Sequence, residues 1–442
     1  IGVGGRLMER FALSRMKEWK ENENRKPLII RGARQVGKTW IMKTFGQQYF
    51  EKTAYVNFDN NARMKQVFEG DLDIERLVLS ISAETGVSIE AENTLIIFDE
   101  VQEVPKALTS LKYFYENAPQ YAIVAAESLL GVALHQGTSF PVGKVDFLDL
   151  YPLNFREFLC AMGEKQFVSM LDSCDTQMVT VFKTKYIERL REYYFVGGMP
   201  EVVKDFSEKK DYNRVRAIQK NLINYYQQDF SKHAEIKLVP RLNLVWNSIP
   251  MQLAKENKKY IYGQVREGSR AKDFELAIQW LLDCGLIHKV QRIQKPDLPL
   301  KAYIDFDAFK LFLVDIGLLI AMTDLDAKVI IEGNKIFTEF KGALTEQYIL
   351  QQLISDVGVI PYYYSTQNSK GEIDFLVQGK TSVIPIEVKA EENLKAKSLK
   401  AFCEKYQPSY AVRTSMSDYR EQDWMTNIPL YAVKWIKNYV NQ

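Results

Sequence analysis

Short apolar runs alternate with helix-like stretches along the first third of the chain. The apolar runs have the length of strands and lie at residues 28–31, 54–58, 95–98 and 121–125. Strands that alternate with helices usually build a parallel sheet covered by helices. The pattern therefore predicts an α/β domain of the nucleotide-binding type over residues 6–150.

The pattern becomes mostly helical after residue 150. Apolar residues recur at helical spacing around 155–159 and again around 186–195. The stretch "VGGMPEVV" at 196–203 then breaks the helix, and Pro200 is well suited to begin the next one. We interpret residues 151–235 as a helical lid or connector.

Residues 236–330 combine helices with a short ribbon. A helical stretch precedes a second one at 270–282, whose apolar side chains share one face at a period of 3.6. Two extended runs follow at 286–293 and 300–304. This order of helix, helix and two-stranded ribbon is typical of a winged-helix domain.

The longest apolar run of the chain, residues 311–322, is interrupted by Asp315. It is shorter than the roughly 20 residues that a helix needs to cross a bilayer. We therefore expect a core helix here and no membrane partner. No signal peptide is expected either, and residues 1–5 are interpreted as a tag remnant or a trimmed start.

The last region, residues 331–442, forms a separate α/β pattern. A helix is expected at 343–353, and strands are expected at 361–365, 373–377 and 383–388. The predicted organisation is thus an α/β domain of the nucleotide-binding type over 6–150, a connector over 151–235, a winged-helix-like domain over 236–330 and a second α/β domain over 331–442.

Composition agrees with a protein of several globular domains. The chain has 442 residues, of which 46% are hydrophobic and 26% are charged, as in ordinary globular proteins. A formal net charge of +2 gives no global argument for nucleic-acid binding. The four cysteines form no CxxC pair, and the three histidines give no zinc pattern. A cytoplasmic location, where thiols stay reduced, fits best.

A phosphate-binding motif follows the first predicted strand. It has the form G-x-x-x-x-G-K-[ST] and consists of Gly32, Ala33, Arg34, Gln35, Val36, Gly37, Lys38 and Thr39, followed by Trp40. Glycines let the backbone N–H groups turn toward a phosphate at the start of the next helix. We expect Lys38 to contact the β and γ phosphates of ATP and the Thr39 hydroxyl to bind Mg²⁺.

Two further strand ends supply candidate partners for this motif. The buried run "TLIIFDE" ends at Asp99, a candidate Mg²⁺ ligand, and Glu100, a candidate base for the attacking water. Ser128 ends the next strand and is a candidate sensor of the γ-phosphate. A serine is also favoured as a helix cap, so both roles remain open for Ser128.

A second candidate site lies near the end of the chain. Asp374 falls in one predicted strand and Glu387 with Lys389 in the next, so a hairpin brings them together. Alternation places Glu387 and Lys389 on one face, where the carboxylates of Asp374 and Glu387 can hold Mg²⁺ and the lysine can steer water. The alternative is that these charged residues are solvated side chains at the end of a hairpin.

Motifs along the whole chain resemble those of one prokaryotic family. They are "GARQVGKT", "FDEVQ", "ESLLG", "LYPLNFREFL", "GGMPEVV", "WLLDCGLI", "FKLFLVDIGLL", "FKGALTEQY" and "GEIDFLV…IPIEVK". The family consists of AAA+ type P-loop ATPases with a C-terminal domain related to PD-(D/E)xK nucleases. The resemblance implies a restriction-endonuclease-like fold for residues 331–442, a place for Glu346 in the nuclease-like site and a place for Gln102 beside Glu100.

The resemblance also implies a homo-oligomer in which a neighbouring subunit completes each ATP site. Lys144 and Arg156 are candidates for that contact, although their spacing does not separate them from ordinary charged residues. One departure from the family is Glu127, which stands before Ser128 where a small residue is expected. A carboxylate beside a triphosphate repels it unless it is turned away or neutralised.

These observations give three functional hypotheses. The first is an ATPase coupled to a nuclease-like domain that acts on or near DNA. The second is a nucleotide-dependent switch or scaffold that binds a protein partner and carries an inactive nuclease fold. The third is a nuclease whose ATPase domain only assembles a ring. ATP and Mg²⁺ are the expected cofactors in all three.

Overall fold

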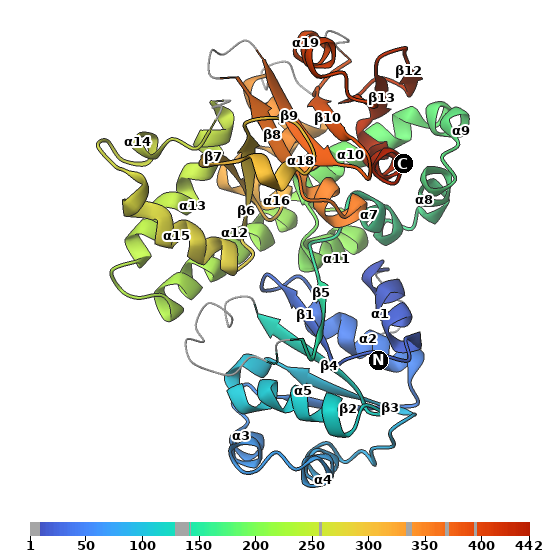
Figure 1. The fold of residues 1–442 in the computed structure, drawn as a ribbon, viewed down its shortest axis with the longest axis vertical. Coiled ribbons are helices and arrows are strands. Elements are labelled where there is room, and N and C mark those ends of the chain that lie inside the picture. The colour runs from blue at the N-terminus through green and yellow to red at the C-terminus, as the bar shows by residue number, and fades with distance from the viewer. Residues whose placement is uncertain are drawn as a thin grey trace. The chain divides into compact units, whose positions relative to one another are not determined.

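The computed structural model describes residues 9–128, 141, 143–255, 259–332, 338–366, 371–392 and 396–442. These residues form two compact units, each with its own sheet and helices (Figure 1). The N-terminal unit consists of Arg10–Tyr151 and Asp283–Leu286, and the C-terminal unit consists of Glu9, Pro152–Leu282 and Ile287–Gln442.

A five-stranded sheet with the order β2-β3-β4-β1-β5 forms the centre of the N-terminal unit. Its strands are β1 (Leu28–Gly32), β2 (Lys52–Asn57), β3 (Thr94–Asp99), β4 (Ala122–Ser128) and β5 (Asp146–Asp149). All neighbouring strands are parallel. The four predicted strands and the parallel sheet are thus confirmed. Because β4 lies between β1 and β3, the ends of all three strands meet at one edge of the sheet.

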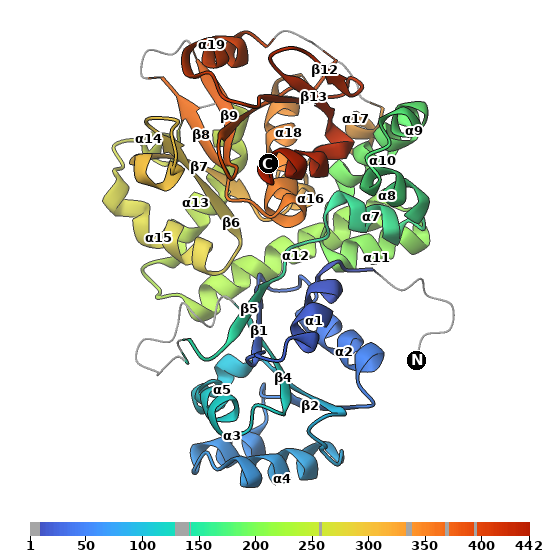
Figure 2. The same ribbon diagram turned by 45° about the vertical axis from the view of Figure 1, so that its right-hand side comes forward.

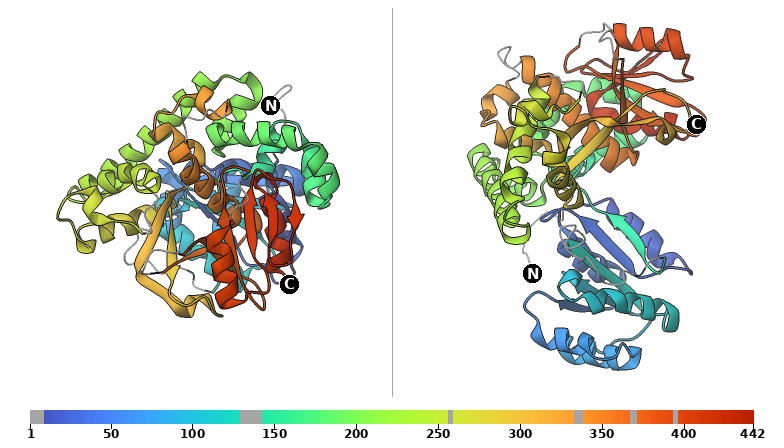
Figure 3. Two further views of the ribbon diagram at one scale, coloured as in Figure 1. Left: turned by 90° about the horizontal axis from the view of Figure 1, so that it is seen from above. Right: turned by 60° about the vertical axis from the view of Figure 1, so that its left-hand side comes forward.

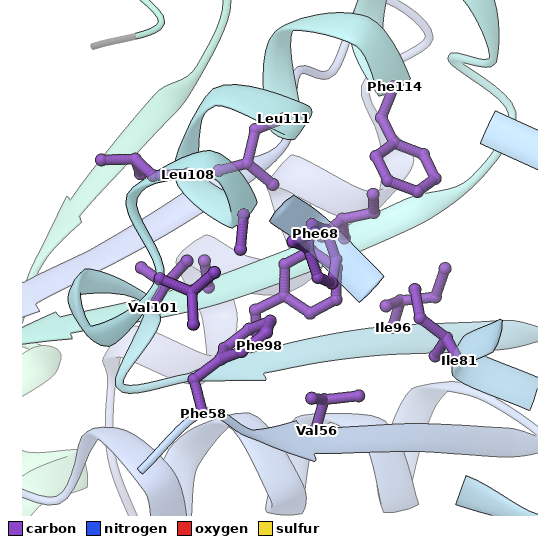
Figure 4. Packing of buried hydrophobic residues seen from close by; sticks show 14 of the residues in the cluster. Val56, Phe58, Phe68, Ile81, Ile96, Phe98, Val101, Leu108, Leu111 and Phe114 are labelled. Carbon is purple, nitrogen blue, oxygen red and sulfur yellow. The ribbon is translucent and has the colours of Figure 1, made fainter. Parts of the chain in front are cut away.

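Helices cover both faces of this sheet. They are α1 (Ala12–Glu21), α2 (Lys38–Tyr49), α3 (Ala62–Glu69), α4 (Ile74–Thr85), the 3₁₀ turn η1 (Val101–Glu103) and α5 (Pro105–Asn117). Side chains of α3, α4 and α5 share one apolar cluster with alternate residues of the strands (Figure 4). Phe58, Phe68 and Phe98 meet edge to face there at centroid distances of 5.4 to 5.7 Å. Helix α2 contacts strands β1 to β4 through residues outside this cluster.

The first part of the C-terminal unit is helical. Its helices are α7 (Phe155–Ala161), α8 (Lys165–Asp172), α9 (Thr176–Val181), α10 (Lys183–Val196), α11 (Pro200–Lys209), α12 (Tyr212–His233), α13 (Val239–Ala254), α14 (Tyr262–Val265), α15 (Ala271–Asp283), α16 (Ile316–Met322) and α17 (Ala327–Ile331). As predicted, Gly197 and Gly198 separate α10 from α11, and Pro200 begins α11.

An eight-stranded sheet with the order β12-β13-β11-β10-β9-β8-β6-β7 completes this unit (Figure 2). Its strands are β6 (Ile287–Ile293), β7 (Ile304–Leu313), β8 (Tyr362–Ser365), β9 (Glu372–Gln378), β10 (Val383–Val388), β11 (Val412–Ser415), β12 (Arg420–Glu421) and β13 (Thr426–Pro429). Strand β8 pairs antiparallel with β9, and β9 with β10, whereas β11 lies parallel to β10.

The hairpin of β6 and β7 belongs to this sheet. Strand β6 pairs antiparallel with β7 on one side and parallel with β8 on the other (Figure 3). The expected boundary between 236–330 and 331–442 therefore runs through a continuous sheet. Residues far apart in the sequence are joined here by backbone hydrogen bonds that no local pattern encodes.

The remaining helices flank the sheet. They are α18 (Thr338–Gln352), the π-helical turn η4 (Leu353–Val357), α19 (Lys397–Tyr406), the 3₁₀ segment η5 (Leu430–Trp435) and α20 (Ile436–Val440). Leu399 and Phe402 of α19 pack with Ile373 and Leu376 of β9 in one apolar cluster. The predicted helix at 343–353 and the three predicted strands after it are confirmed.

Two predicted elements differ from the structure. The expected helix over 311–322 is wrong in its first part, because Leu311–Leu313 end strand β7 and α16 begins only at Ile316. Asp315 separates the two elements by accepting a hydrogen bond from Leu318 N at 3.1 Å as the helix N-cap. The expected extended run at 300–304 is a 3₁₀ turn over Leu300–Tyr303. In the part of the chain that the structure describes, no helix is long and apolar enough to cross a membrane.

Candidate functional site

The phosphate loop connects the end of β1 to the start of α2. Its backbone turns through left-handed conformations at Gln35, with φ of 65°, and at Gly37, with φ of 94°. A Cβ atom on Gly32 would meet the Leu150 carbonyl oxygen at 2.3 Å, so this position needs glycine. A side chain would therefore clash at Gly32 and be strained at Gly37.

An arginine from outside the motif holds this loop. The Arg10 guanidinium donates to Val36 O at 3.1 Å and to Tyr151 O at 2.6 Å. Arg10 is 4% exposed, and Ala33 and Val36 of the loop are also buried. Sequence analysis missed Arg10 because it precedes the motif and belongs to no recognisable pattern.

Lys38 lies buried under the loop at the first position of α2. Its Nζ donates to Gly32 O and Ala33 O, both at 2.9 Å. Burial lowers the pKa of Lys38 to about 8, although Glu100 and Asp99 act to raise it. The nearby carboxylates therefore do not fully compensate the ammonium group for its burial. The group lies at a helix N-terminus, a position that favours a phosphate anion.

Asp99 accepts hydrogen bonds from two hydroxyl groups through one carboxylate oxygen. Thr39 Oγ1 lies 2.7 Å and Tyr55 Oη 2.8 Å from Asp99 Oδ2. The structure thus brings together Thr39 and Asp99, the two Mg²⁺ ligands predicted for the nucleotide site. Tyr55 was missed, although β2 pairs Tyr55 with Ile97, two residues before Asp99 and hence on the same face of the sheet.

Glu100 and Gln102 follow directly after β3. Glu100 has a left-handed backbone with φ of 53°, which is uncommon for a residue other than glycine. Its carboxylate accepts a hydrogen bond from the Gln102 side-chain amide. Such local strain is often found at functional sites, and here it sets the carboxylate beside the strand end that carries Asp99.

Glu127 is buried near the phosphate loop, with 1% of the residue exposed. Strand β4 pairs it with Arg31 of β1, and its Oε2 has no hydrogen-bond partner. Burial raises the pKa of Glu127 to about 7, while Arg31 and Lys38 act to lower it. The alternation along β4 places Glu127 on the face of Ile123 and Ala125. The side chain of Ser128, the sensor candidate, lies outside the described residues.

Replacing Glu127 with glutamine is expected to remove a pH dependence of stability. The pKa of Glu127 rises from its ordinary 4.5 to about 7 on folding. Between these values the folded state holds a proton that the unfolded state loses, so the free energy of unfolding falls as pH rises. Above this window, Glu127→Gln should be more stable than wild type by roughly 3 kcal/mol. Urea unfolding at several pH values measures this difference.

The exposed Glu103 provides the matched control for that measurement. Glu103→Gln should unfold with the same pH dependence as the wild type. The free energy of unfolding is compared between the two pKa values. If it changes with pH by the same amount in Glu127→Gln and in wild type, Glu127 does not titrate in this way.

The predicted nuclease-like residues fall into two groups. Glu346 Oε2 lies 3.4 Å from Nζ of Lys310, and burial, together with Glu346, raises the pKa of Asp374 well above its ordinary value. Glu387 instead pairs with Lys389 at 3.0 Å. No group of three or more His, Cys, Asp or Glu side chains is arranged to hold a metal ion among the residues that the structure describes.

Asp374 is also bonded to the backbone, since its Oδ2 accepts a hydrogen bond from Val388 N at 2.7 Å. One oxygen of Glu387, Oε2, is buried without a hydrogen-bond partner. Sequence analysis missed Lys310 and Glu372, which lie 2.7 Å apart in an ion pair beside Glu346. The two carboxylates that were expected to share a metal therefore interact with different partners here.

The two candidate residues for a neighbour's ATP site have partners within their own units. Lys144 pairs with Glu116 at 3.0 Å. The Arg156 side chain is 7% exposed and forms ion pairs with Asp356 at 3.0 Å and Asp172 at 3.1 Å. Removing Arg156 would leave Asp356 as an unpaired buried charge in the C-terminal unit, which is costly.

Three family models match different parts of the sequence. Residues 24–159 match the AAA domain, which agrees with the P-loop fold of the N-terminal unit and with ATP binding. Residues 187–329 match a domain of unknown function (DUF8612), and residues 341–433 match another (DUF4143). No curated protein sequence matches the chain.

Solved structures share low sequence identity with this chain. A Walker-type ATPase of Pyrococcus abyssi is 14% identical, with a TM-score of 0.44, over 72% of this chain and 96% of that one. The RuvB Holliday junction branch migration motor of Thermotoga maritima is 11% identical, with a TM-score of 0.30, over 63% and 87%. Cdc6p of Pyrobaculum aerophilum is 8% identical, with a TM-score of 0.25, over 75% and 97%.

Proposed function

We propose that this chain is a Mg²⁺-dependent ATPase whose nucleotide state controls the C-terminal unit. The observation that supports hydrolysis most directly is the bond between Thr39 and Asp99 beside the buried Lys38. Hydroxyl and carboxylate oxygens are the ligands that Mg²⁺ prefers, and a desolvated ammonium group attracts the phosphates strongly. The residues present therefore fit MgATP.

Each residue of the site has a definite task in this proposal. Lys38 and the loop N–H groups bind the phosphates, and Thr39 and Asp99 hold Mg²⁺, which neutralises charge on the phosphate oxygens. Glu100 orients the attacking water and takes its proton. Gln102 fixes the Glu100 carboxylate through their hydrogen bond, and Tyr55 fixes Asp99.

Replacing Glu100 with glutamine is expected to separate binding from hydrolysis. The amide keeps the size of the side chain and still accepts a hydrogen bond, but it cannot take a proton. ATP affinity should stay within about threefold of wild type, whereas kcat should fall by about 10²-fold or more. Calorimetry measures the affinity, and phosphate release measures kcat.

Glu103→Gln is the control for this prediction, because Glu103 lies three residues further on and is exposed. Its kcat should equal that of wild type. A Glu100→Gln enzyme that turned over ATP at the wild-type rate would assign the base to another residue.

We further propose that the C-terminal unit acts on or near DNA as a nuclease-like domain. The order α18, β8, β9, β10, α19 and β11 supports this proposal, with Asp374 on β9, Glu387 on the adjacent β10 and Lys389 directly after β10. Plasmid and linear DNA incubated with the protein, Mg²⁺ or Mn²⁺, and ATP test it. Cleavage that disappears in Asp374→Ala is the expected result for a nuclease.

A second candidate function is a nucleotide-dependent switch that binds a protein partner. It is favoured by the separation of the acidic residues described above, since Glu346 pairs with Lys310 while Glu387 pairs with Lys389. DNA that stays intact under all of these conditions supports this second function. Either function agrees with a homo-oligomer, which sedimentation with and without nucleotide tests.

A further inference from the structure

Lys310 on strand β7 is a buried cation surrounded by carboxylates. Only 8% of the residue is exposed. Its Nζ lies 2.7 Å from Glu372 Oε1 and 3.4 Å from Glu346 Oε2, and Asp374 also acts electrostatically on it. The carboxylates come from two elements of the C-terminal unit, α18 and β9, and surround an ammonium group carried by a third, β7.

The electrostatics of this cluster favour a permanently charged lysine. Burial acts to lower the pKa of Lys310, but Glu346, Glu372 and Asp374 outweigh it, and the pKa rises above its ordinary value. Burial and the neighbouring Glu346 raise the pKa of Asp374 well above its ordinary value. The Lys310 ammonium group thus contacts oxygens of two carboxylates, those of Glu372 and Glu346, and neutralises part of the negative charge of the cluster.

The sheet topology delivers Lys310 to this place. Strand β7 pairs Lys310 with Val290 of β6, and β6 pairs with β8 next to β9. Arg292 and Asp305 form a further ion pair across the hairpin, with Arg292 Nε 3.0 Å from Asp305 Oδ2. Lys310 therefore lies on a strand of a hydrogen-bonded hairpin and not in a loop.

We propose that the Lys310 ammonium group takes the place of a divalent cation in the cluster of Glu346, Glu372 and Asp374. Two cations cannot occupy one cluster a few ångströms across without strong repulsion, and the metal would need the oxygens that Lys310 already contacts. The C-terminal unit therefore binds neither Mg²⁺ nor Mn²⁺ at these residues while Lys310 is in place. Metal-dependent cleavage through Asp374 is switched off in this arrangement.

The cluster is within reach of ions from solution. A small pocket lined by Gln252, Lys259 and Tyr260 opens onto Lys310 and Glu346. Lys259 adds a second positive charge at this pocket, which further disfavours an entering cation. The exclusion of metal thus follows from charge and not from a closed surface.

This inference deepens the second candidate function and does not depend on ATP binding. Its test is a titration of the full-length, nucleotide-free protein with Mn²⁺. The electron paramagnetic resonance signal of free Mn²⁺ measures how much of the ion is bound. Wild type is expected to have no stoichiometric Mn²⁺ site that depends on Asp374. Asp374→Asn should therefore bind as much Mn²⁺ as wild type. Lys310→Met should gain one site that binds Mn²⁺ at least about tenfold more tightly than wild type.

Two matched variants make the test specific. Lys310→Arg keeps the cation and should resemble wild type, whereas the double variant Lys310→Met/Asp374→Asn should lose the gained site. A Mn²⁺ site in wild type that Asp374→Asn abolishes would overturn the proposal. A folded Lys310→Met protein that gains no Mn²⁺ site would also overturn it. If Lys310→Met is too unstable to isolate, the comparison of wild type with Asp374→Asn still shows whether wild type has a Mn²⁺ site that depends on Asp374.

ATP titration of the same preparations keeps this result separate from the ATPase proposal. Unchanged ATP affinity in Lys310→Met is expected, because Lys310 lies in the C-terminal unit and the phosphate loop in the N-terminal unit. A failure to bind ATP in all of the proteins would refute the ATPase proposal and leave the assignment of Lys310 intact.

Discussion

Replacing Lys38 with alanine is expected to abolish ATP binding and turnover. The variant loses the buried ammonium that two loop carbonyls hold at 2.9 Å, and it leaves those carbonyls without this donor. The positive potential at the start of α2 then comes only from backbone dipoles and from the more distant charge of Arg34. We expect ATP affinity and turnover each to fall by about 10²-fold or more. Calorimetry and phosphate release measure the two effects.

Lys17→Ala is a suitable control, since Lys17 lies on α1 in the same unit and its side chain is 53% exposed. That variant should bind and hydrolyse ATP like the wild type. Unchanged turnover in Lys38→Ala would end the ATPase proposal. A pH profile adds a second readout: because burial lowers the pKa of Lys38 to about 8, the ATP affinity of wild type should weaken as pH rises through this value.

The nucleotide site was largely predictable because its chemistry is local in the sequence. Gly32 to Thr39 are contiguous, and Asp99 ends a strand whose buried character is plain from its composition. Parallel strands end at one edge of a sheet, so the meeting of Thr39 and Asp99 follows from the strand order. Tyr55 and Arg10 escaped prediction because their contacts arise only when β2 and the segment before α1 take their places in the fold.

The C-terminal site was less predictable because its contacts depend on pairing between distant strands. The predicted hairpin was expected to bring Asp374 and Glu387 together so that both bind one Mg²⁺ ion. The pairing of β8 with β9 contains a register shift between Tyr362 and Tyr364, next to Asp374, and such irregularities re-aim side chains. Lys310 could not be foreseen at all, because it belongs to a hairpin that was expected in another domain.

A buried aspartate connects three elements of the C-terminal unit. Asp315 is fully buried at the start of α16 and accepts hydrogen bonds from Gly198 N at 2.6 Å, Leu318 N at 3.1 Å and Gln351 Nε2 at 3.3 Å. Gly197 leaves the room for this contact, since a Cβ atom there would meet Asp315 Oδ1 at 2.2 Å. Both glycines that break the helical pattern in the sequence thus serve the Asp315 carboxylate. Gly197 leaves space for it, and Gly198 N donates a hydrogen bond to it.

Asp315→Ala is expected to destabilise the C-terminal unit by about 3 to 5 kcal/mol, because Gly198 N and Leu318 N would lose this acceptor, while Gln351 Nε2 would keep only its hydrogen bond to Tyr193 Oη. Urea unfolding followed by tryptophan fluorescence measures the loss, since Trp246 and Trp435 are buried in this unit. Asp324→Ala is the control, because that side chain is 73% exposed and its ion pair with Lys220 contributes little. Asp315→Asn retains one acceptor oxygen and should fall between wild type and alanine. An alanine variant as stable as the control would show that the loop of Gly198 is held by packing and not by this carboxylate.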